Sequence, residues 1–504
     1  MLRKSLIVVF FLFFTKNLCF GLTLLDKENF VLSMGTYLRT DAVTFKNVAD
    51  LDSANSDDTT AYFGIDYSLG FNLAARDKDL KFYLKLERNG PYDYDAPLFV
   101  HNTLVNSSGR IEKYRNDELL PNIEEFWLDA VLLKPFRFKV GLYTYEVGKG
   151  FALNGAYENY GLTIFRESKD FAWRFYYCRP DINYRDRLGP HISQEKEQDI
   201  AYEHNKANFF ATDIKFKRDK DTFQPYAGAL VDYTSEGKRD NRFTAPIKRD
   251  ILGTFGLSWM REYPRLTWSL ELAHNFGKAK SSDPQYKDVY HTGYLIYAGL
   301  DYNIGRLNPS FQFLLCSGNK VTPQMAQDQD TTLTSGKNRA FSYSSPLNRN
   351  LSDSISSSNV DILPIVAMGG GYGLNYAVPR PRTFASADFD NLILPTLGFD
   401  YKMSEKLKIG VYGYYLMSFE KPVGTLNGEG RFLSKDLGYE GDLFIDYQVN
   451  KHTLISVLGG YFIPGKYYKE ARDDTEGSLF STFLRGDGSA DLAYQVELAV
   501  EFNF

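Results

Sequence analysis

The last fourteen residues of the chain, DLAYQVELAVEFNF, alternate between two kinds of side chain. Every even position is apolar or aromatic, up to Phe504, whereas the odd positions include Gln495 and Glu497. Because successive side chains of a β-strand point to opposite faces, this period of two predicts a strand with one apolar and one polar face. Globular strands usually have about 5–6 residues, whereas a tilted strand that crosses hydrocarbon needs about 9–11. Long alternating runs recur at 61–74, 266–276 and 437–449.

The connections between the expected strands alternate in length. Short turns of two to five residues, such as 134–135 and 450–452, are interleaved with linkers of 13 to 73 residues. A soluble sandwich has no reason to sort its loops in this way, whereas an outer-membrane barrel has short periplasmic turns and long extracellular loops. We therefore expect an all-β, transmembrane antiparallel β-barrel of about eighteen strands, with both termini on the short-turn side. A secreted all-β sandwich is the alternative. The expected strands are 30–40, 61–74, 80–88, 123–133, 136–145, 160–166, 171–178, 208–217, 223–233, 250–261, 266–276, 290–304, 309–317, 391–401, 407–419, 437–449, 453–463 and 490–504.

The composition and the first residues agree with an outer-membrane location. Aromatic residues make up 16% of the chain, which suits the aromatic girdles of a membrane barrel. Arg3 and Lys4 precede a short apolar run, and the small residue Gly21 follows, which is the layout of a secretory signal peptide. We expect residues 1–21 to be this peptide, with a retained anchor as the alternative, and 22–504 to be one barrel domain. Whether Cys178 and Cys316 pair is left open.

The longest linker, 318–390, is rich in Ser, Asn, Asp and Gly. Such a segment either folds inward as a constriction or lid, or covers the outer mouth of the barrel. Its apolar piece DILPIVAM, residues 361–368, could instead form an additional strand pair, which would raise the count to twenty.

The inward positions of the expected strands differ in charge between the two halves of the chain. In the second half they are largely acidic, with Glu271, Glu440 and Asp442 among them. Charged walls in a narrow passage select solutes, so we expect a basic wall that guides an anionic or hydroxyl-rich solute, with tyrosines as flat faces for sugar rings. The bland alternative is that any water-filled barrel has charged lumen residues. The expected pore-lining residues are Arg39, Lys81, Lys85, Arg137, Lys139, Arg174, Lys215, Tyr143 and Tyr176.

Catalytic and cofactor motifs were sought in the same sequence. The six histidines form no recognisable arrangement with a nucleophile, and neither HExxH nor CxxC occurs. A net charge of −5 gives no support for nucleic-acid binding. We therefore expect a protein that is not an enzyme and has no cofactor and no metal site. Its expected partners are outer-membrane lipid, a polysaccharide or sugar solute, and the barrel assembly machinery that reads the terminal aromatic strand, and we expect a monomer.

The stretch LGYEGDLFIDYQVNKHTLISVLGGYFIPG, residues 437–465, resembles the alginate export porins of bacterial outer membranes. That family carries a Leu-Gly-x-Glu-x-Asp-Leu strand, a short turn, a Gly-rich strand and an aromatic-x-Pro-Gly ending near its C-terminus. Weaker similarity lies at 138–151, where Leu142 and Tyr143 stand in place of the family's Arg-Gln pair, and at 311–319. The resemblance implies an eighteen-stranded monomeric barrel that passes an anionic polysaccharide outward through a basic constriction.

Three functions follow as expectations. The first is an outer-membrane channel that passes a polysaccharide or oligosaccharide, of the alginate-export kind. The second is a general or sugar diffusion porin for small hydrophilic solutes, and the third is a barrel that binds or adheres through its long loops. The identity of the solute, the direction of transport and any gating by 318–390 stay open at this point.

Overall fold

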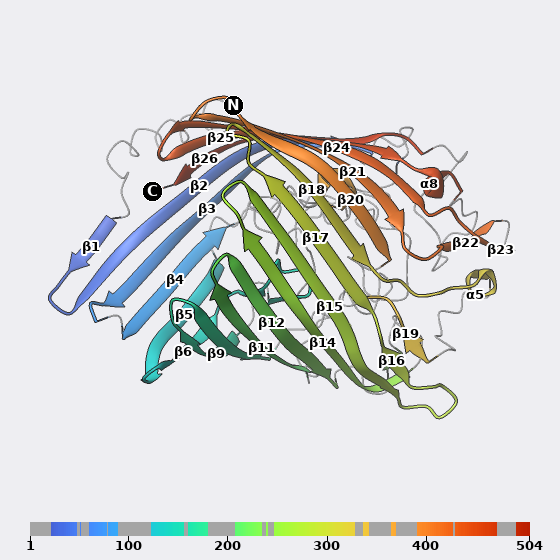
Figure 1. Ribbon diagram of the computed structural model, residues 1–504, viewed down its shortest axis with the longest axis horizontal. Coiled ribbons are helices and arrows are strands. Elements are labelled where there is room, and N and C mark those ends of the chain that lie inside the picture. The colour runs from blue at the N-terminus through green and yellow to red at the C-terminus, as the bar shows by residue number, and fades with distance from the viewer. Residues whose placement is uncertain are drawn as a thin grey trace, which may run out of the picture.

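Among the residues that the structure describes, eighteen antiparallel strands follow one another around a closed ring (Figure 1). The computed structural model describes residues 22–47, 51, 60–77, 79–88, 122–155, 160–179, 207–233, 238–239, 246–327, 336–341, 364–368, 391–426, 429–470 and 490–503. The ring consists of β2 (Phe30–Lys46), β3 (Thr60–Ala75), β4 (Leu80–Arg88), β5 (Asn122–Leu133), β6 (Phe136–Leu142), β9 (Tyr160–Glu167), β10 (Phe171–Cys178), β11 (Ala207–Arg218), β12 (Asp221–Asp232), β14 (Pro246–Glu262), β15 (Leu266–Ser281), β17 (Tyr294–Tyr302), β18 (Leu307–Cys316), β20 (Leu392–Lys402), β21 (Leu407–Ser418), β24 (Asp436–Asn450), β25 (Thr453–Pro464) and β26 (Ala493–Asn503).

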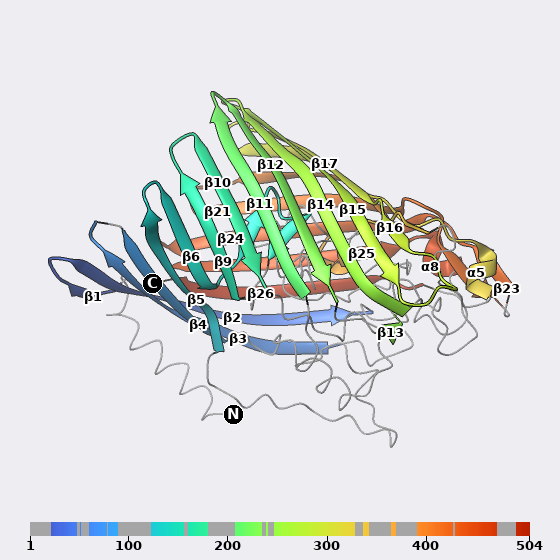
Figure 2. The ribbon, with the colours of Figure 1, turned by 90° about the horizontal axis from the view of Figure 1, so that it is seen from below.

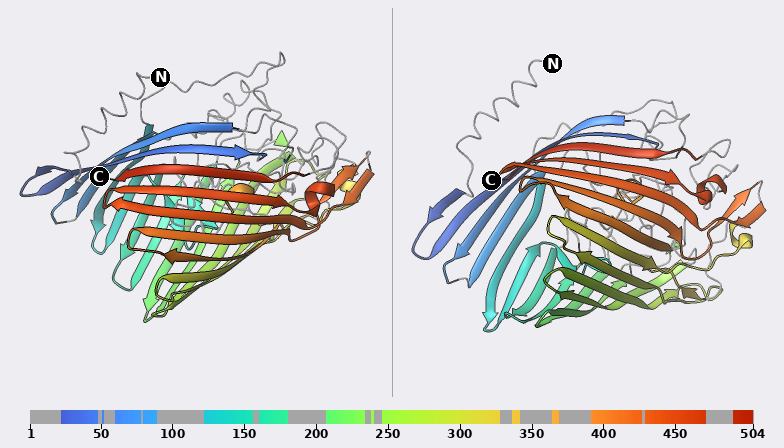
Figure 3. Two further views of the ribbon diagram at one scale, coloured as in Figure 1. Left: turned by 90° about the horizontal axis from the view of Figure 1, so that it is seen from above. Right: turned by 45° about the horizontal axis from the view of Figure 1, so that its top comes forward.

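The last strand closes the ring on the first. β26 pairs with β2 from Tyr37↔Asn503 to Lys46↔Tyr494, and Figures 2 and 3 show the two strands side by side among the tilted staves. Closure leaves no free edge in the wall and satisfies backbone N–H and C=O groups from strand to strand. The expected barrel and its count of eighteen are confirmed in the described part of the chain.

The outer face of the wall is apolar and the inner face is polar. Ile65, Phe255 and Leu397 are exposed on the outside, whereas their strand neighbours Ser68, Thr254 and Thr396 are buried inside. This inversion of a soluble protein is expected where acyl chains, and not water, meet the outer surface. None of the helices in the described residues has the length and apolar character that a membrane span requires.

Several expected strands end differently in the structure; β2 and β15, for example, continue to Lys46 and Ser281. The strand expected at 136–145 ends at Leu142, because the chain turns into the lumen beyond Gly141. Gly141 has a φ of 132°, and a Cβ there would lie 2.0 Å from the carbonyl oxygen of Phe126, so only glycine fits. The strand expected at 290–304 is divided into a short β16 (Val289–His291) and the wall strand β17.

Shorter elements lie at the two ends of the barrel. β1 (Leu22–Asp26) folds back on β2 at the end with the short turns, while the opposite end carries the elements of the long linkers (Figure 1). The piece expected to form an additional strand pair contains a helical turn instead, α7 (Ile365–Met368). Residues 1–21 and Phe504 lie outside the described residues. The elements at the long-linker end are β13 (Lys238–Arg239), β16, β19 (Lys337–Asn338), β22 (Val423–Leu426), β23 (Glu429–Phe432), α5 (Pro323–Gln327) and α8 (Lys466–Glu470).

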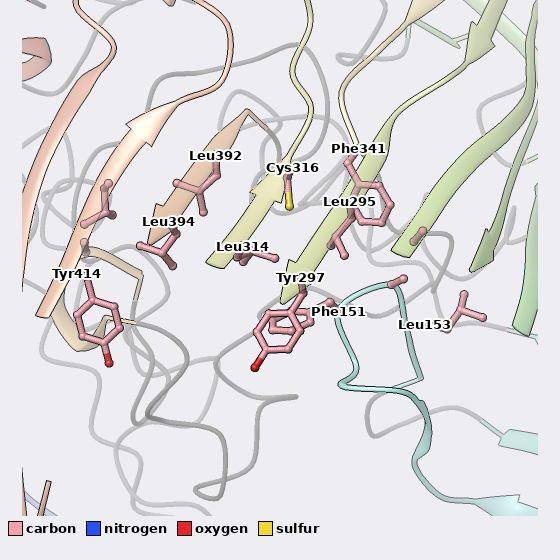
Figure 4. Packing of buried hydrophobic residues seen from close by; sticks show 14 of the residues in the cluster. Phe151, Leu153, Leu295, Tyr297, Leu314, Cys316, Phe341, Leu392, Leu394 and Tyr414 are labelled. Atoms are coloured by element: carbon pink, nitrogen blue, oxygen red, sulfur yellow. The ribbon is translucent and has the colours of Figure 1, made fainter. Parts of the chain in front are cut away.

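The hydrophobic core lies inside the barrel. Phe151 and Leu153, which follow β6 in the chain, pack among inward side chains of the wall, including Tyr297 and Leu295 (Figure 4). Cys316 belongs to the same cluster, and both it and Cys178 are buried and form no disulfide with each other.

Candidate solute channel

A hairpin of residues 143–155 lies inside the lumen, and we call it the inward hairpin. It contains β7 (Tyr145–Val147) and β8 (Leu153–Gly155), which pair with each other and not with the wall. β6 has only seven residues against twelve in β5, so the chain leaves the wall part-way along its height. Tyr145 and Val147 are buried against the wall, whereas Thr144 and Glu146 are exposed. Non-ladder backbone at membrane depth is tolerated where it lines a cavity.

Buried polar partners fix the inward hairpin to the wall. Tyr145 Oη donates a hydrogen bond of 2.9 Å to Asp213 Oδ1, and the backbone N–H of Lys149 donates one of 2.7 Å to Glu271 Oε2. Burial and the neighbouring Asp213 carboxylate raise the pKa of the Tyr145 phenol, so this phenol stays a donor at physiological pH. Phe151 adds a ring contact with Tyr297, with centroids 5.1 Å apart (Figure 4). The hairpin is therefore a fixed part of the lumen.

A second segment, residues 364–368, lies against another part of the inner wall, and we call it the inner segment. The backbone N–H of Ile365 donates to Asp442 Oδ2 at 3.0 Å, and those of Val366 and Ala367 donate to the two oxygens of Glu440 at 2.5 and 2.7 Å. In the ring order, β24 to β26 lie roughly opposite the strands β9 to β17 that hold the inward hairpin. The lumen is thus narrowed from two sides.

These contacts change the meaning of the acidic positions expected to line one wall. Glu271, Glu440 and Asp442 do face inward, but all three are buried and accept hydrogen bonds from backbone N–H groups of the two inward segments. A carboxylate used in this way stabilises a loop and is not offered to a passing solute. Residues 364–368 of the long linker 318–390 thus lie inside the lumen, which agrees with the expectation that this linker folds inward.

Four of the seven expected basic residues are paired with carboxylates. Arg39 pairs with Glu497 and Glu501 across the seam where β2 meets β26. The other three pairs are Lys85 with Glu87, Arg137 with Asp129 at 2.9 Å, and Arg174 with Asp213 at 2.9 Å. Positive charge on this wall is therefore largely balanced locally. This differs from the expectation of a basic wall facing an acidic one.

The other three expected basic residues have different surroundings. The Lys139 ammonium lies between two rings, 4.1 Å from the centroid of Trp127 and 4.2 Å from that of Tyr143. Such cation–π contacts attract the ammonium group to the ring faces. Lys81 and Lys215 also point inward by strand register, and none of the three forms an ion pair with another described residue.

The two expected tyrosines do not offer free ring faces. Tyr143 is 3% exposed and Tyr176 is 0% exposed, although both come from inward positions. Tyr176 stacks on Tyr145 with centroids 4.5 Å apart, and Tyr143 Oη lies 2.7 Å from Thr163 Oγ1. These rings bind the root of the inward hairpin to β9 and β10.

Trp127 is a lumen residue that the expected pore lining does not include. It lies on the inward face of β5 between Glu125 and Asp129, and its ring is 5.4 Å from that of Tyr83 on β4. Both rings are partly exposed. The signal was present, because EEFWLDA places the tryptophan at the same parity as these two acidic residues.

The chain is similar to several solved structures at low sequence identity. No protein-family model and no curated protein sequence matches the chain. Among solved structures, the chain is similar to Pseudomonas aeruginosa OccK11 (OpdR), with 9% identity, a TM-score of 0.47, and coverage of 96% of this chain and 100% of that one. It is also similar to Pseudomonas aeruginosa OccK8 (OprE), with 9% identity, a TM-score of 0.49, and coverage of 94% and 98%. Vibrio cholerae OmpT has 10% identity, a TM-score of 0.37, and coverage of 95% and 99%.

At these values the solved structures assign no family and no solute. The barrel itself carries the argument: a closed antiparallel ring with an apolar outer surface is the architecture of bacterial outer-membrane proteins, and the chain is located there. The resemblance to alginate export porins gains no support from any of the comparisons and depends only on the residues quoted for it.

Proposed function

We propose that this protein is an outer-membrane channel for small hydrophilic solutes. One observation carries the proposal: the inward hairpin is held inside an eighteen-stranded barrel by buried hydrogen bonds, with the inner segment on the other side. Barrels of about 16–18 strands enclose a water-filled lumen. Two fixed inward segments narrow such a lumen, so the channel selects solutes first by their size.

The same geometry favours small solutes over an exported polyanion. A polyanion channel needs unbalanced positive charge along its wall, whereas Arg39, Arg137 and Arg174 are each paired with a carboxylate. The export of an alginate-like polysaccharide stays a prediction from the family resemblance. Passage of a long polyuronate through the reconstituted protein would support it.

Liposome swelling tests the proposal. We expect purified protein in liposomes to admit monosaccharides and to exclude sugars above a size limit, and to conduct ions in planar bilayers. Replacing residues 144–154 with a short Gly-Ser linker should raise both the size limit and the conductance, because this removes the anchored part of the inward hairpin.

A matched control is the same replacement of the β22–β23 hairpin, which lies at the mouth and forms its own separate sheet. That variant should keep the wild-type size limit. A folded barrel without conductance would overturn the proposal, as would an unchanged size limit after the inward hairpin is removed.

A further inference from the structure

Two aromatic rings lie next to each other on the inner wall. Tyr83 on β4 and Trp127 on β5 are directly paired in register, with centroids 5.4 Å apart and an interplanar angle of 33°. The hydroxyl end of the Tyr83 ring extends over Gly70 on β3, where a Cβ would lie only 2.9 Å from Tyr83 Oη. The missing side chain of Gly70 allows the tyrosine to lie against the wall. We call the two rings the platform.

The platform differs from other aromatic side chains in the lumen. Its rings are partly exposed, whereas most tyrosine rings that point into the lumen are buried. Tyr176, for example, is covered by Tyr145 and by Phe209. The platform therefore keeps apolar ring surface accessible to a solute in the lumen. The buried inward rings include Tyr143, Tyr145, Tyr176, Tyr226, Tyr297, Tyr412 and Tyr414.

Polar groups surround the platform in balanced sets. Trp127 Nε1 donates to Glu125 Oε2 at 3.2 Å, and Lys85 pairs with Glu87 on the same strand as Tyr83. The Lys139 ammonium lies over the Trp127 ring, 4.1 Å from its centroid. These groups present hydrogen-bond donors and acceptors beside the rings, while the pairing limits the net field. A few placed polar groups around apolar surface are the usual form of a small-ligand site.

We propose that the platform is a subsite for a neutral sugar ring. The proposal rests on the proposed function and specifies its solute class. A pyranose ring has an apolar face of C–H groups, which packs against an aromatic ring, and a rim of hydroxyls, which suits Glu125 and the Lys85–Glu87 pair. An anion would gain less, because the three cations around the platform, Lys85, Arg137 and Lys139, are matched by three carboxylates, those of Glu87, Asp129 and Glu125.

The test measures block of the ion current by a neutral trisaccharide, maltotriose, in planar bilayers. With wild-type protein we expect a saturable block. Tyr83→Ala and Trp127→Ala should each weaken the apparent affinity by about fivefold or more, the lower end of what stacking on an aromatic ring contributes. Tyr83→Phe keeps the ring face and should stay within about twofold of wild type. Unheated gel electrophoresis confirms that each variant is a folded barrel.

The control is Phe444→Ala, which removes a partly exposed inward ring from β24 on another part of the wall and should leave the affinity unchanged. A conducting wild-type channel without saturable block would overturn the subsite and leave the proposed function standing, whereas a folded barrel with no conductance would overturn both. Equal losses in Tyr83→Ala and Phe444→Ala would also overturn the subsite. Tighter block by a triuronate than by maltotriose would overturn its neutral class.

Discussion

Arg39 joins the first and last strands of the ring, and its replacement is the sharpest test of how the barrel closes. Its side chain is 3% exposed and pairs with Glu497, which is 0% exposed, and with Glu501, which is 16% exposed. The Arg39 Nη1 to Glu501 Oε1 distance is 2.7 Å. In Arg39→Met, two carboxylates remain inside the wall without their cation.

The cost follows from burial. Removing one partner of a buried ion pair costs about 3–5 kcal/mol, because the remaining charge is left uncompensated. Arg76 and Asp26 form an ion pair with side chains that are 51% and 55% exposed, so Arg76→Ala should cost less than about 1 kcal/mol. Replacing Arg39, Glu497 and Glu501 together with Met or Leu should be neutral or stabilising by about 1–4 kcal/mol, because no charge is then buried.

Urea unfolding of the purified barrel, followed by tryptophan fluorescence, gives the free energies of unfolding of these variants. The expected order is the triple apolar variant at or above wild type, Arg76→Ala close to wild type, and Arg39→Met lowest. A cost of Arg39→Met no greater than that of Arg76→Ala would refute the reasoning, since it would mean that water reaches the seam.

Three further predictions concern the lumen. Gly148→Ala should alter the single-channel conductance, because its Cβ would lie 2.6 Å from Glu271 Oε2 at a φ of 66°; Gly305→Ala, at a similar φ with open space around it, should not. Glu440→Ala should raise the size limit in liposome swelling, because it releases the inner segment. Asp446→Ala on the same strand should leave the limit unchanged, because the Asp446 carboxylate accepts a hydrogen bond from the Ser456 hydroxyl and not from the inner segment. The two buried thiols should react with a maleimide only after the barrel unfolds, which mass spectrometry can follow.

The wall could be predicted from the sequence because its strands depend on local information. Lipid outside and water inside impose a period of two on every wall strand, and each wall strand pairs with the next one along the chain. β24 and β25 illustrate this: Leu443 and Tyr447 face out, while Asp442 and Asp446 face in, as their alternation predicts. The expected and the observed strands differ mainly at their ends, as at Gly141, where the chain leaves the wall.

The partners of the inward charges could not be predicted from the same pattern. The alternation does not show that Arg39 and Glu497 are partners, because they lie 458 residues apart in the chain and only closure of the ring makes their strands neighbours. The inward hairpin could not be predicted from the sequence for another reason. Its residues also alternate, since Tyr145 and Val147 face the wall while Thr144 and Glu146 face the lumen, and a wall strand shows the same period.

Both inward segments are held by hydrogen bonds from backbone N–H groups to wall carboxylates. These bonds explain why a count of inward acidic residues overestimates the negative charge that a solute meets in the lumen. A segment that enters the barrel loses the strand partners of its backbone N–H groups, and each unsatisfied group inside costs free energy. A wall carboxylate can accept such groups: Glu271 accepts one N–H of the hairpin, and Glu440 accepts two of the inner segment. Glycine supplies the space, Gly148 beside Glu271 and Gly460 beside Val366. Glu271 and Glu440 are therefore better interpreted as anchors for the two inward segments than as charges that face the solute.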